Sequence, residues 1–217
     1  MTQLLLDIAP EWRPSLDNFV AGRNDELLFT LKQALSNKTT ERCVYLWGEA
    51  GCGKSHLLQA VASLARTMGM LSLYACGTVP EAGQVVAVDD VETLDEAAQI
   101  TLFELYNRMR ENGGMLLVGG SASPLQLPLR EDLRTRLGWG LVYQVHSLSD
   151  EEKAKALTQH AQAKGFILPP EVRQYLLVHG RRNLPSLLAV LDALDTHCLR
   201  LKRAASVPLL KEVMQKM

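Results

Sequence analysis

Residues 48–55 read Gly-Glu-Ala-Gly-Cys-Gly-Lys-Ser and fit the pattern G-x-x-x-x-G-K-S. An apolar run precedes them and a helical pattern follows them, which is the context that this pattern requires. Glycines there let successive backbone N–H groups point at phosphate oxygens, at a helix N-terminus that already favours anions. Lys54 is expected to reach the β and γ phosphates, and Ser55 is expected to offer its hydroxyl to Mg²⁺. The segment predicts a nucleotide phosphate site rather than a glycine-rich turn without a ligand.

A pair of carboxylates follows another apolar run, at residues 85–88. Asp89 is expected to face the metal, directly or through water, and Asp90 is expected to face the attacking water. A solvated turn is the alternative, but the position downstream of the phosphate loop favours the functional reading. Residues 37–40, Asn-Lys-Thr-Thr, lack the aspartate of the N-K-x-D pattern that selects guanine. Adenine nucleotide is therefore expected.

Two arginines, Arg134 and Arg136, lie just before the last predicted strand. An arginine at the edge of an α/β unit can reach the γ-phosphate held by a neighbouring subunit, and in trans it is worth ~10³–10⁵ in rate. From the residues alone, an ordinary surface arginine and an arginine that acts in trans are equally favoured. Cys52 lies near Lys54 at a helix start, which favours its thiolate. A loop wrapped around phosphate leaves no room for catalysis by that thiol.

Alternating strands and helices must position these residues. Helices are expected over residues 24–35, 54–68, 95–110 and 130–137, and strands over residues 43–47, 70–74, 84–88, 115–118 and 141–145. This order predicts an α/β fold with a parallel five-stranded sheet and helices on both faces. After residue 149 only helical patterns occur, over residues 150–164, 170–178, 184–203 and 207–217. The sequence Ser-Asp-Glu-Glu at residues 149–152 is typical of a helix start.

Composition supports a globular chain without a wide basic surface. The 217 residues are 47% hydrophobic and 22% charged, and 23 basic against 24 acidic side chains give a net charge of −1. That balance disfavours a protein that grips nucleic-acid backbones directly. No apolar run approaches the ~20 residues needed to cross a bilayer, and the first ten residues do not resemble a signal peptide. Four cysteines without a C-x-x-C pair disfavour zinc and disulfides and favour a cytoplasmic location.

These motifs resemble those of the AAA+ ATPases, and within them the DnaA initiator clade, over nearly the whole chain. Residues 15–22 are similar to the adenine-side box, residues 88–91 resemble the D-D form of Walker B, and Arg136 in T-R-L-G-W-G matches the arginine-finger box. The resemblance implies a P-loop base over residues 11–148, a helical lid over residues 149–217, and bound ADP or ATP with Mg²⁺. The nucleotide-binding residues that it implies are Asn18, Phe19, Val20, Gly48, Ala50, Gly51, Cys52, Gly53, Lys54, Ser55 and His56.

Three departures from the clade affect the functional prediction. The chain stops at Met217, after the lid, so no domain that reads double-stranded DNA is expected. Residues 75–83 are too few for the helical insertion that engages single-stranded DNA, because a parallel crossover takes about a dozen residues or more. Either this crossover is a loop or residues 70–74 are not a parallel strand. Pro185 stands where the lid's sensor arginine is expected, with Arg181, Arg182 and Ser121 as weak substitutes for the sensors. Nucleotide binding is expected to be intact and autonomous hydrolysis weak or absent.

The N-terminal residues 1–10 contain a second recognisable pattern. Residues 3–8, Gln-Leu-Leu-Leu-Asp-Ile, resemble the Q-L-x-L-x-L peptide that docks on the β sliding clamp of DNA polymerase III. Gln3, Leu4, Leu6 and Ile8 are the implied clamp-binding residues, with the glutamine hydrogen-bonded and the aliphatic side chains in pockets. Packing of this apolar segment on its own domain is the alternative.

A clamp peptide on a DnaA-like body implies a regulatory inactivator of DnaA. Such a protein stimulates hydrolysis of DnaA-bound ATP, with Arg136 in trans, and meets DNA only indirectly through the clamp. No membrane contact is expected, and a homo-oligomer remains open. An autonomous ATPase of the helicase-loader type, and a clamp-binding adaptor without DnaA contact, are the alternatives.

Overall fold

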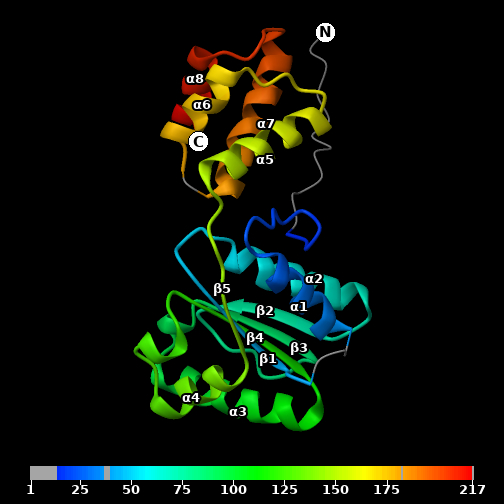
Figure 1. The fold of residues 1–217 in the computed structure, drawn as a ribbon, viewed down its shortest axis with the longest axis vertical. Coiled ribbons are helices and arrows are strands. Elements are labelled where there is room, and N and C mark those ends of the chain that lie inside the picture. Colours follow the sequence, from blue (N-terminus) through cyan, green and yellow to red (C-terminus); the bar gives the residue numbers. More distant parts are fainter. Residues whose placement is uncertain (1–13, 37–39, 182, 217) are drawn as a thin grey trace.

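The computed structural model describes residues 14–36, 40–181 and 183–216, and a parallel sheet lies at the centre of its lower half (Figure 1). The strands are β1 (Cys43–Trp47), β2 (Ser72–Cys76), β3 (Val85–Asp89), β4 (Met115–Gly120) and β5 (Leu141–Gln144). Their order is β2-β3-β4-β1-β5, and every neighbouring pair is parallel. The three inner strands are almost continuously buried, which explains their unbroken apolar sequences. The predicted five-stranded parallel sheet is confirmed.

Helices cover both faces of the sheet (Figure 1). Helices α1 (Asp25–Leu35) and α2 (Lys54–Thr67) lie on one face, and α3 (Glu96–Asn112) and α4 (Glu131–Trp139) lie on the other. Two apolar clusters fill the layers: Leu31 and Leu57 are fully buried in the first, and Leu102 and Leu133 in the second. Short 3₁₀ turns, η1 (Val91–Thr93) and η2 (Pro124–Gln126), follow β3 and β4. The strands are therefore packed between two layers of helices.

The crossover from β2 to β3 is a loop. Strand β2 begins at Ser72, two positions later than the sequence pattern suggested, because Leu71 still belongs to the preceding connection and its carbonyl accepts hydrogen bonds from the N–H groups of Gln84 and Val85. Ser72 then pairs in parallel with Val85. Residues 77–84 contain no helix, and Arg108 of α3 anchors them by donating to the Glu81 carbonyl at 2.8 Å. Of the two alternatives left open, the loop crossover is the correct one.

A separate bundle of four helices follows β5 and lies above the base in Figure 1. It contains α5 (Asp150–Ala163), α6 (Pro170–His179), α7 (Leu184–Leu201) and α8 (Val207–Lys216). Its own core includes the fully buried Leu157, Leu176 and Leu210. No helix in the described parts of the chain is long and apolar enough to span a membrane. The predicted all-helical lid is confirmed as a second packed unit.

Helix α5 starts with a complete capping box at the junction between the two units. The Ser149 hydroxyl accepts a hydrogen bond from the Glu152 N–H at 3.2 Å, and the Glu152 carboxylate accepts one from the Ser149 N–H at 2.7 Å. The two bonds satisfy N–H groups that have no partner within the helix. The junction therefore has a defined helix start.

Substituting Ser149→Ala is expected to lower the free energy of unfolding by about 1 kcal/mol, because a helix N–H loses its acceptor. Urea denaturation followed by circular dichroism measures the change. Ser149→Thr keeps a hydroxyl at the same place and is the matched control. Equal stability of the alanine and threonine variants would contradict the importance of the cap.

Candidate nucleotide-binding site

The loop between β1 and α2 has a backbone that only glycine adopts easily. Gly48, Gly51 and Gly53 have φ values of 154°, 80° and 111°. A Cβ atom on Gly48 would lie 2.5 Å from the Val145 carbonyl oxygen, and one on Gly53 would lie 2.7 Å from the Phe19 ring. The glycines are therefore needed both for the turn and for the close approach of its neighbours. The loop leads directly into the N-terminus of α2, where backbone N–H groups attract anions.

Lys54 is the cation of this loop. It is only 8% exposed, and its Nζ donates hydrogen bonds to the carbonyls of Gly48 at 2.8 Å and Glu49 at 3.1 Å. A buried ammonium inside a glycine-rich turn fits a phosphate chain, because it supplies positive charge beside oriented N–H groups. Burial raises the pKa of the Cys52 thiol above its usual value, and the opposing effect of Lys54 is smaller. The thiolate that the sequence context favoured at Cys52 is thus not favoured in the fold.

The predicted adenine-side residues meet the loop at a cavity of about 190 Å³. The Phe19 and His56 rings pack at a centroid distance of 5.4 Å, and His56 Nε2 lies 2.9 Å from the Ser15 carbonyl oxygen. Burial lowers the pKa of His56, so its ring is neutral at pH 7. The cavity is lined by Asn18, Phe19, Val20, Glu49, Ala50, Gly51, Cys52, Gly53, His56, Ser147, Leu148, Lys153, Leu184 and Pro185. Gly48, Lys54 and Ser55 belong to the same loop and first helical turn.

The lid contributes residues that the sequence patterns did not identify. Asn183 caps α7 by accepting a hydrogen bond from the Ser186 N–H at 2.9 Å, and its Cβ would lie 3.1 Å from a Cβ on Gly51. The start of α7 therefore touches the phosphate loop. Lys153 of α5 lines the cavity together with Pro185. Only the fold brings this lysine to the site, and its sequence signal is no more than a basic residue one turn into α5.

The sensor substitutes that the sequence offered are not brought into this cavity. Arg181 is exposed, and Ser121 is exposed just after β4. Arg182 lies outside the described residues, as do the clamp-peptide residues Gln3, Leu4, Leu6 and Ile8. At the position of the expected sensor arginine the cavity has the pyrrolidine ring of Pro185. The residues described there include a lysine from α5 but no arginine.

The carboxylates Asp89 and Asp90 lie at the end of β3, at the same edge of the sheet as the phosphate loop. Asp89 is 1% exposed, and its carboxylate accepts hydrogen bonds from the Asp90 N–H and the Tyr74 hydroxyl, both at 3.1 Å. Asp90 adopts a left-handed conformation with φ 51°. A buried carboxylate and the exposed hydroxyl of Ser55 are the oxygen donors that suit Mg²⁺, which keeps waters and phosphate oxygens as its other ligands.

Strand β2 supplies two further contacts that sequence reasoning missed. Tyr74 donates to Asp89, and the Cys76 thiol donates to the Asp90 carboxylate at 3.3 Å. The neighbouring Asp90 raises the pKa of Cys76 to about 11, so the thiol keeps the proton that it donates. Tyr74 and Cys76 occupy alternate positions of one strand, so they point to the same face. The alternate spacing of Tyr74 and Cys76 is visible in the sequence. It indicates contacts with the aspartates only once β2 is known to pair with β3.

Arg136 lies near the amino ends of the strands, opposite the end that carries the phosphate loop. It belongs to α4, which ends at Trp139, and β5 begins at Leu141. The arginine is therefore near the amino end of β5, whereas the phosphate loop follows the carboxyl end of β1. Its guanidinium lies 4.3 Å from the centre of the Trp139 ring and 5.7 Å from that of Phe103. The structure does not bring Arg136 to the protein's own loop.

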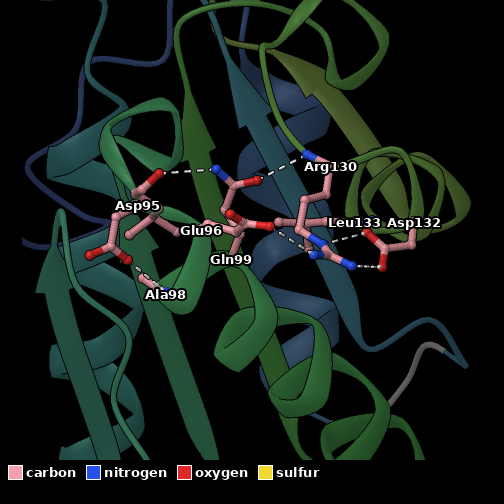
Figure 2. Close-up of polar contacts among 8 residues, drawn as sticks. Asp95, Glu96, Ala98, Gln99, Arg130, Asp132 and Leu133 are labelled. Carbon is pink, nitrogen blue, oxygen red and sulfur yellow. Dashed lines mark hydrogen bonds and ion pairs between the residues drawn. The ribbon is translucent and has the colours of Figure 1, made fainter.

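A polar network fixes the start of α4 (Figure 2). Gln99 of α3 is 8% exposed; its Nε2 donates to the Leu94 carbonyl at 3.0 Å, and its Oε1 accepts from the Arg130 N–H at 2.9 Å. The Arg130 guanidinium contacts Asp132 with two donors, at 3.2 and 3.0 Å, and lies 3.5 Å from Glu96. The segment after Asp90 is thereby joined to the helix that bears Arg136.

Comparisons with known proteins agree on the class that this geometry defines. The chain aligns with domain III of the Thermotoga maritima replication initiation protein DnaA at a TM-score of 0.76 and 16% identity, over 93% of this chain and 95% of that one. AMPPCP-bound DnaA from Aquifex aeolicus matches at 0.72 and 21% identity over 84% of this chain, which spans only 65% of that protein. The Thermotoga maritima RuvB Holliday junction branch migration motor matches at 0.67 and 18%, over 93% and 71%. The fold is that of a AAA+ P-loop NTPase.

Two family models give the more specific assignment. Residues 11–70 match the bacterial DnaA ATPase domain, and residues 150–214 match the Hda lid domain. The resemblance predicted from the motifs is confirmed. The first part of the base is thus similar to the DnaA ATPase domain, and the lid is similar to that of Hda.

Gly119 of β4 makes room for Asp89, and its substitution tests the packing of the site. A Cβ on Gly119 would lie 2.6 Å from Asp89 Oδ1 and 2.8 Å from a methyl of Leu58. Gly119→Ala is expected to lower the free energy of unfolding by about 1–3 kcal/mol, as other overpacked positions do. Gly138→Ala is the matched control: its Cβ would meet nothing within 4 Å in α4, and it is expected to stabilise by about 0.5–1 kcal/mol. Denaturant titration of both variants measures the contrast, and equal effects would contradict it.

Proposed function

We propose that this protein is an Hda-like negative regulator of replication initiation. It binds adenine nucleotide and stimulates hydrolysis of the ATP bound to the initiator DnaA, which leaves DnaA in its inactive ADP form. The observation that carries the proposal is the position of Arg136, at the opposite edge of the sheet from its own phosphate loop. An arginine placed there acts on the nucleotide of another subunit. The Hda-type lid and the DnaA-type base support DnaA as that subunit.

The protein's own nucleotide has a binding and organising role in this proposal. The loop at residues 48–55 holds the phosphates of ADP or ATP, and Ser55 and Asp89 hold Mg²⁺ where it is bound. The AMPPCP-bound relative from Aquifex aeolicus supports the choice of adenine. Two observations support weak autonomous hydrolysis. Pro185 offers no charge to the phosphates, and Asp90, the predicted base, already accepts the hydrogen bond of Cys76.

On DnaA the contribution of Arg136 is electrostatic. In the transition state, negative charge is spread over the equatorial oxygens of the transferring phosphoryl group and develops on the leaving oxygen, and a guanidinium that donates to these oxygens stabilises it more than the ground state. Arginine suits this role because its planar donors match phosphate oxygens and it stays charged at every physiological pH. The water that attacks, and the metal that neutralises the phosphates, belong to the DnaA site.

In this role the protein binds DNA-loaded sliding clamps in the cytoplasm, near the nucleoid. The pattern of Gln3, Leu4, Leu6 and Ile8 supports binding to the clamp. A net charge of −1 is consistent with reaching DNA through the clamp and not by direct grip. The clamp then raises the local concentration of the regulator where replication is under way.

Arg136→Ala is expected to abolish the stimulation of DnaA-bound ATP hydrolysis, a loss that for an arginine in trans reaches ~10³-fold or more. The measurement is the conversion of DnaA-ATP to DnaA-ADP with loaded clamps, together with nucleotide affinity, which is expected to be unchanged. Arg134→Ala, two residues away on a different face of α4, is the control. Stimulation that survives Arg136→Ala would refute the finger assignment, and rapid ATP turnover by the protein alone with single-stranded DNA would favour the autonomous ATPase.

The clamp peptide is tested by a pull-down on immobilised β clamp. The double variant Gln3→Ala/Leu4→Ala is expected to lose binding, since it removes the hydrogen-bonding side chain and one pocket-filling side chain. Leu5→Ala is the matched control, because residue 5 is a variable position in the pattern, and it is expected to bind as the intact protein does. Equal retention of all three proteins would remove the clamp from the proposed function.

A further inference from the structure

We propose that Trp139 is a positioning residue for Arg136: its ring holds the guanidinium by the flat face and leaves the donor edge free for a phosphate of an ATP-bound partner. The inference deepens the proposed function and rests on it. It adds a named residue and a physical role to the trans-acting arginine.

The stacking geometry comes from two helices. Arg136 and Trp139 are three positions apart on α4, a spacing that puts two side chains on one helix face. The guanidinium carbon lies 4.3 Å from the Trp139 ring centre, well within the range of about 6 Å for a cation–π contact. Phe103 of α3 faces the same guanidinium at 5.7 Å. The closer ring, Trp139, is therefore the main platform.

The charge of Arg136 is not neutralised by a carboxylate. In the described parts of the chain no hydrogen bond or ion pair reaches its guanidinium, whereas Arg130 on the same helix contacts both Asp132 and Glu96. All five N–H donors of a guanidinium point outward in its plane. Stacking uses the face of the group, so the donors stay available for phosphate oxygens. A carboxylate partner would occupy these donors and would have to be displaced first.

Trp139 is unusually exposed for so large an apolar side chain, at 56%. It borders an open hollow of about 650 Å³ whose other walls are Phe103, residues 130–132, Thr135 and Arg136. Tryptophan is highly buried in most proteins, so an exposed ring that contacts a functional arginine calls for a functional reason. A platform at the edge of a docking hollow provides one. The ring stays accessible until a partner covers it.

Helix α4 itself is rigid, so the side chain of Arg136 is the part that needs support. Leu133 and Leu137 are fully buried, and Gln99 ties the N–H of Arg130 to the segment after β3 (Figure 2). The long arginine side chain has several rotatable bonds beyond this fixed backbone. Stacking on Trp139 selects among its rotamers before the partner arrives. Reactions of this kind are sensitive to such orientation, and a misplacement of about 1 Å can cost ~10²-fold in rate.

The test compares Trp139→Leu, which keeps an apolar side chain without a π face, with Trp139→Phe, which keeps the π face. DnaA-ATP hydrolysis is titrated with each variant in the presence of loaded clamps. We expect Trp139→Leu to lower the maximal stimulated rate by about 10- to 100-fold and to leave the half-maximal concentration within about twofold. Trp139→Phe is expected to recover most of the rate. Phe29→Leu, an exposed aromatic on α1, is the control for loss of any surface ring.

A readout without DnaA keeps the inference separate from the proposed function. Ring currents from Trp139 are expected to shift the side-chain NMR signals of Arg136 upfield in the intact protein, and Trp139→Leu is expected to remove most of the shift, leaving the smaller contribution of Phe103, with an unchanged melting temperature. Normal Arg136 signals in the intact protein would overturn the inference, as would a full stimulated rate for Trp139→Leu. A raised half-maximal concentration at full maximal rate would make Trp139 a docking residue and overturn it as well. Failure of the intact protein and Arg136→Ala to differ would instead refute the proposed function.

Discussion

All five strands of the sheet run in the same direction, so its two edges are chemically different. The carboxyl ends of β1 and β3 bring the phosphate loop and the aspartates together at one edge. The amino end of β5, immediately after α4, brings Arg136 to the other. This polarity arises because each crossover returns the chain to the same end of the sheet before the next strand begins. The separation between the protein's own nucleotide site and the arginine that is proposed to act in trans is therefore a property of the sheet.

The nucleotide edge is organised by close packing between backbone and side chains. Gly48 and Gly53 let the loop lie against Val145 and the Phe19 ring, and Gly119 leaves room for the buried Asp89 carboxylate. Strand β2 adds two hydrogen bonds to this site. Because β2 pairs with β3 and a loop follows it, Tyr74 can donate to Asp89 and Cys76 can donate to Asp90. Both carboxylates thus have protein donors. These donors, and the proline at the position of the expected sensor, support the proposal that nucleotide is bound and hydrolysed weakly.

Much of this fold can be predicted from the sequence, and the reasons are local. Apolar runs that end in glycine or aspartate mark the strands, and the G-x-x-x-x-G-K-S pattern sits between a strand and a helix. The start of β2 was misplaced by two residues because Met70 and Leu71 extend the apolar run beyond the paired strand. What remained hidden depends on tertiary neighbours: Lys153 reaches the cavity only through the lid, and Cys52 keeps its proton because burial outweighs a nearby lysine.

Arg130, the N-cap residue of α4, and Arg136, within the helix, differ in the groups that their guanidinium groups contact. Arg130 has its donors engaged by Asp132 and Glu96, and its backbone N–H is held by Gln99, so it fixes the helix start. Arg136 lies nearly two turns further on, where its guanidinium contacts aromatic rings and, among the described residues, forms no ion pair with a carboxylate. Side-chain carboxylates stabilise a guanidinium but occupy the donors that a phosphate needs, whereas rings stabilise it without occupying them. The difference in partners, more than the position of the charge, supports the proposal that Arg136 serves a ligand of another subunit.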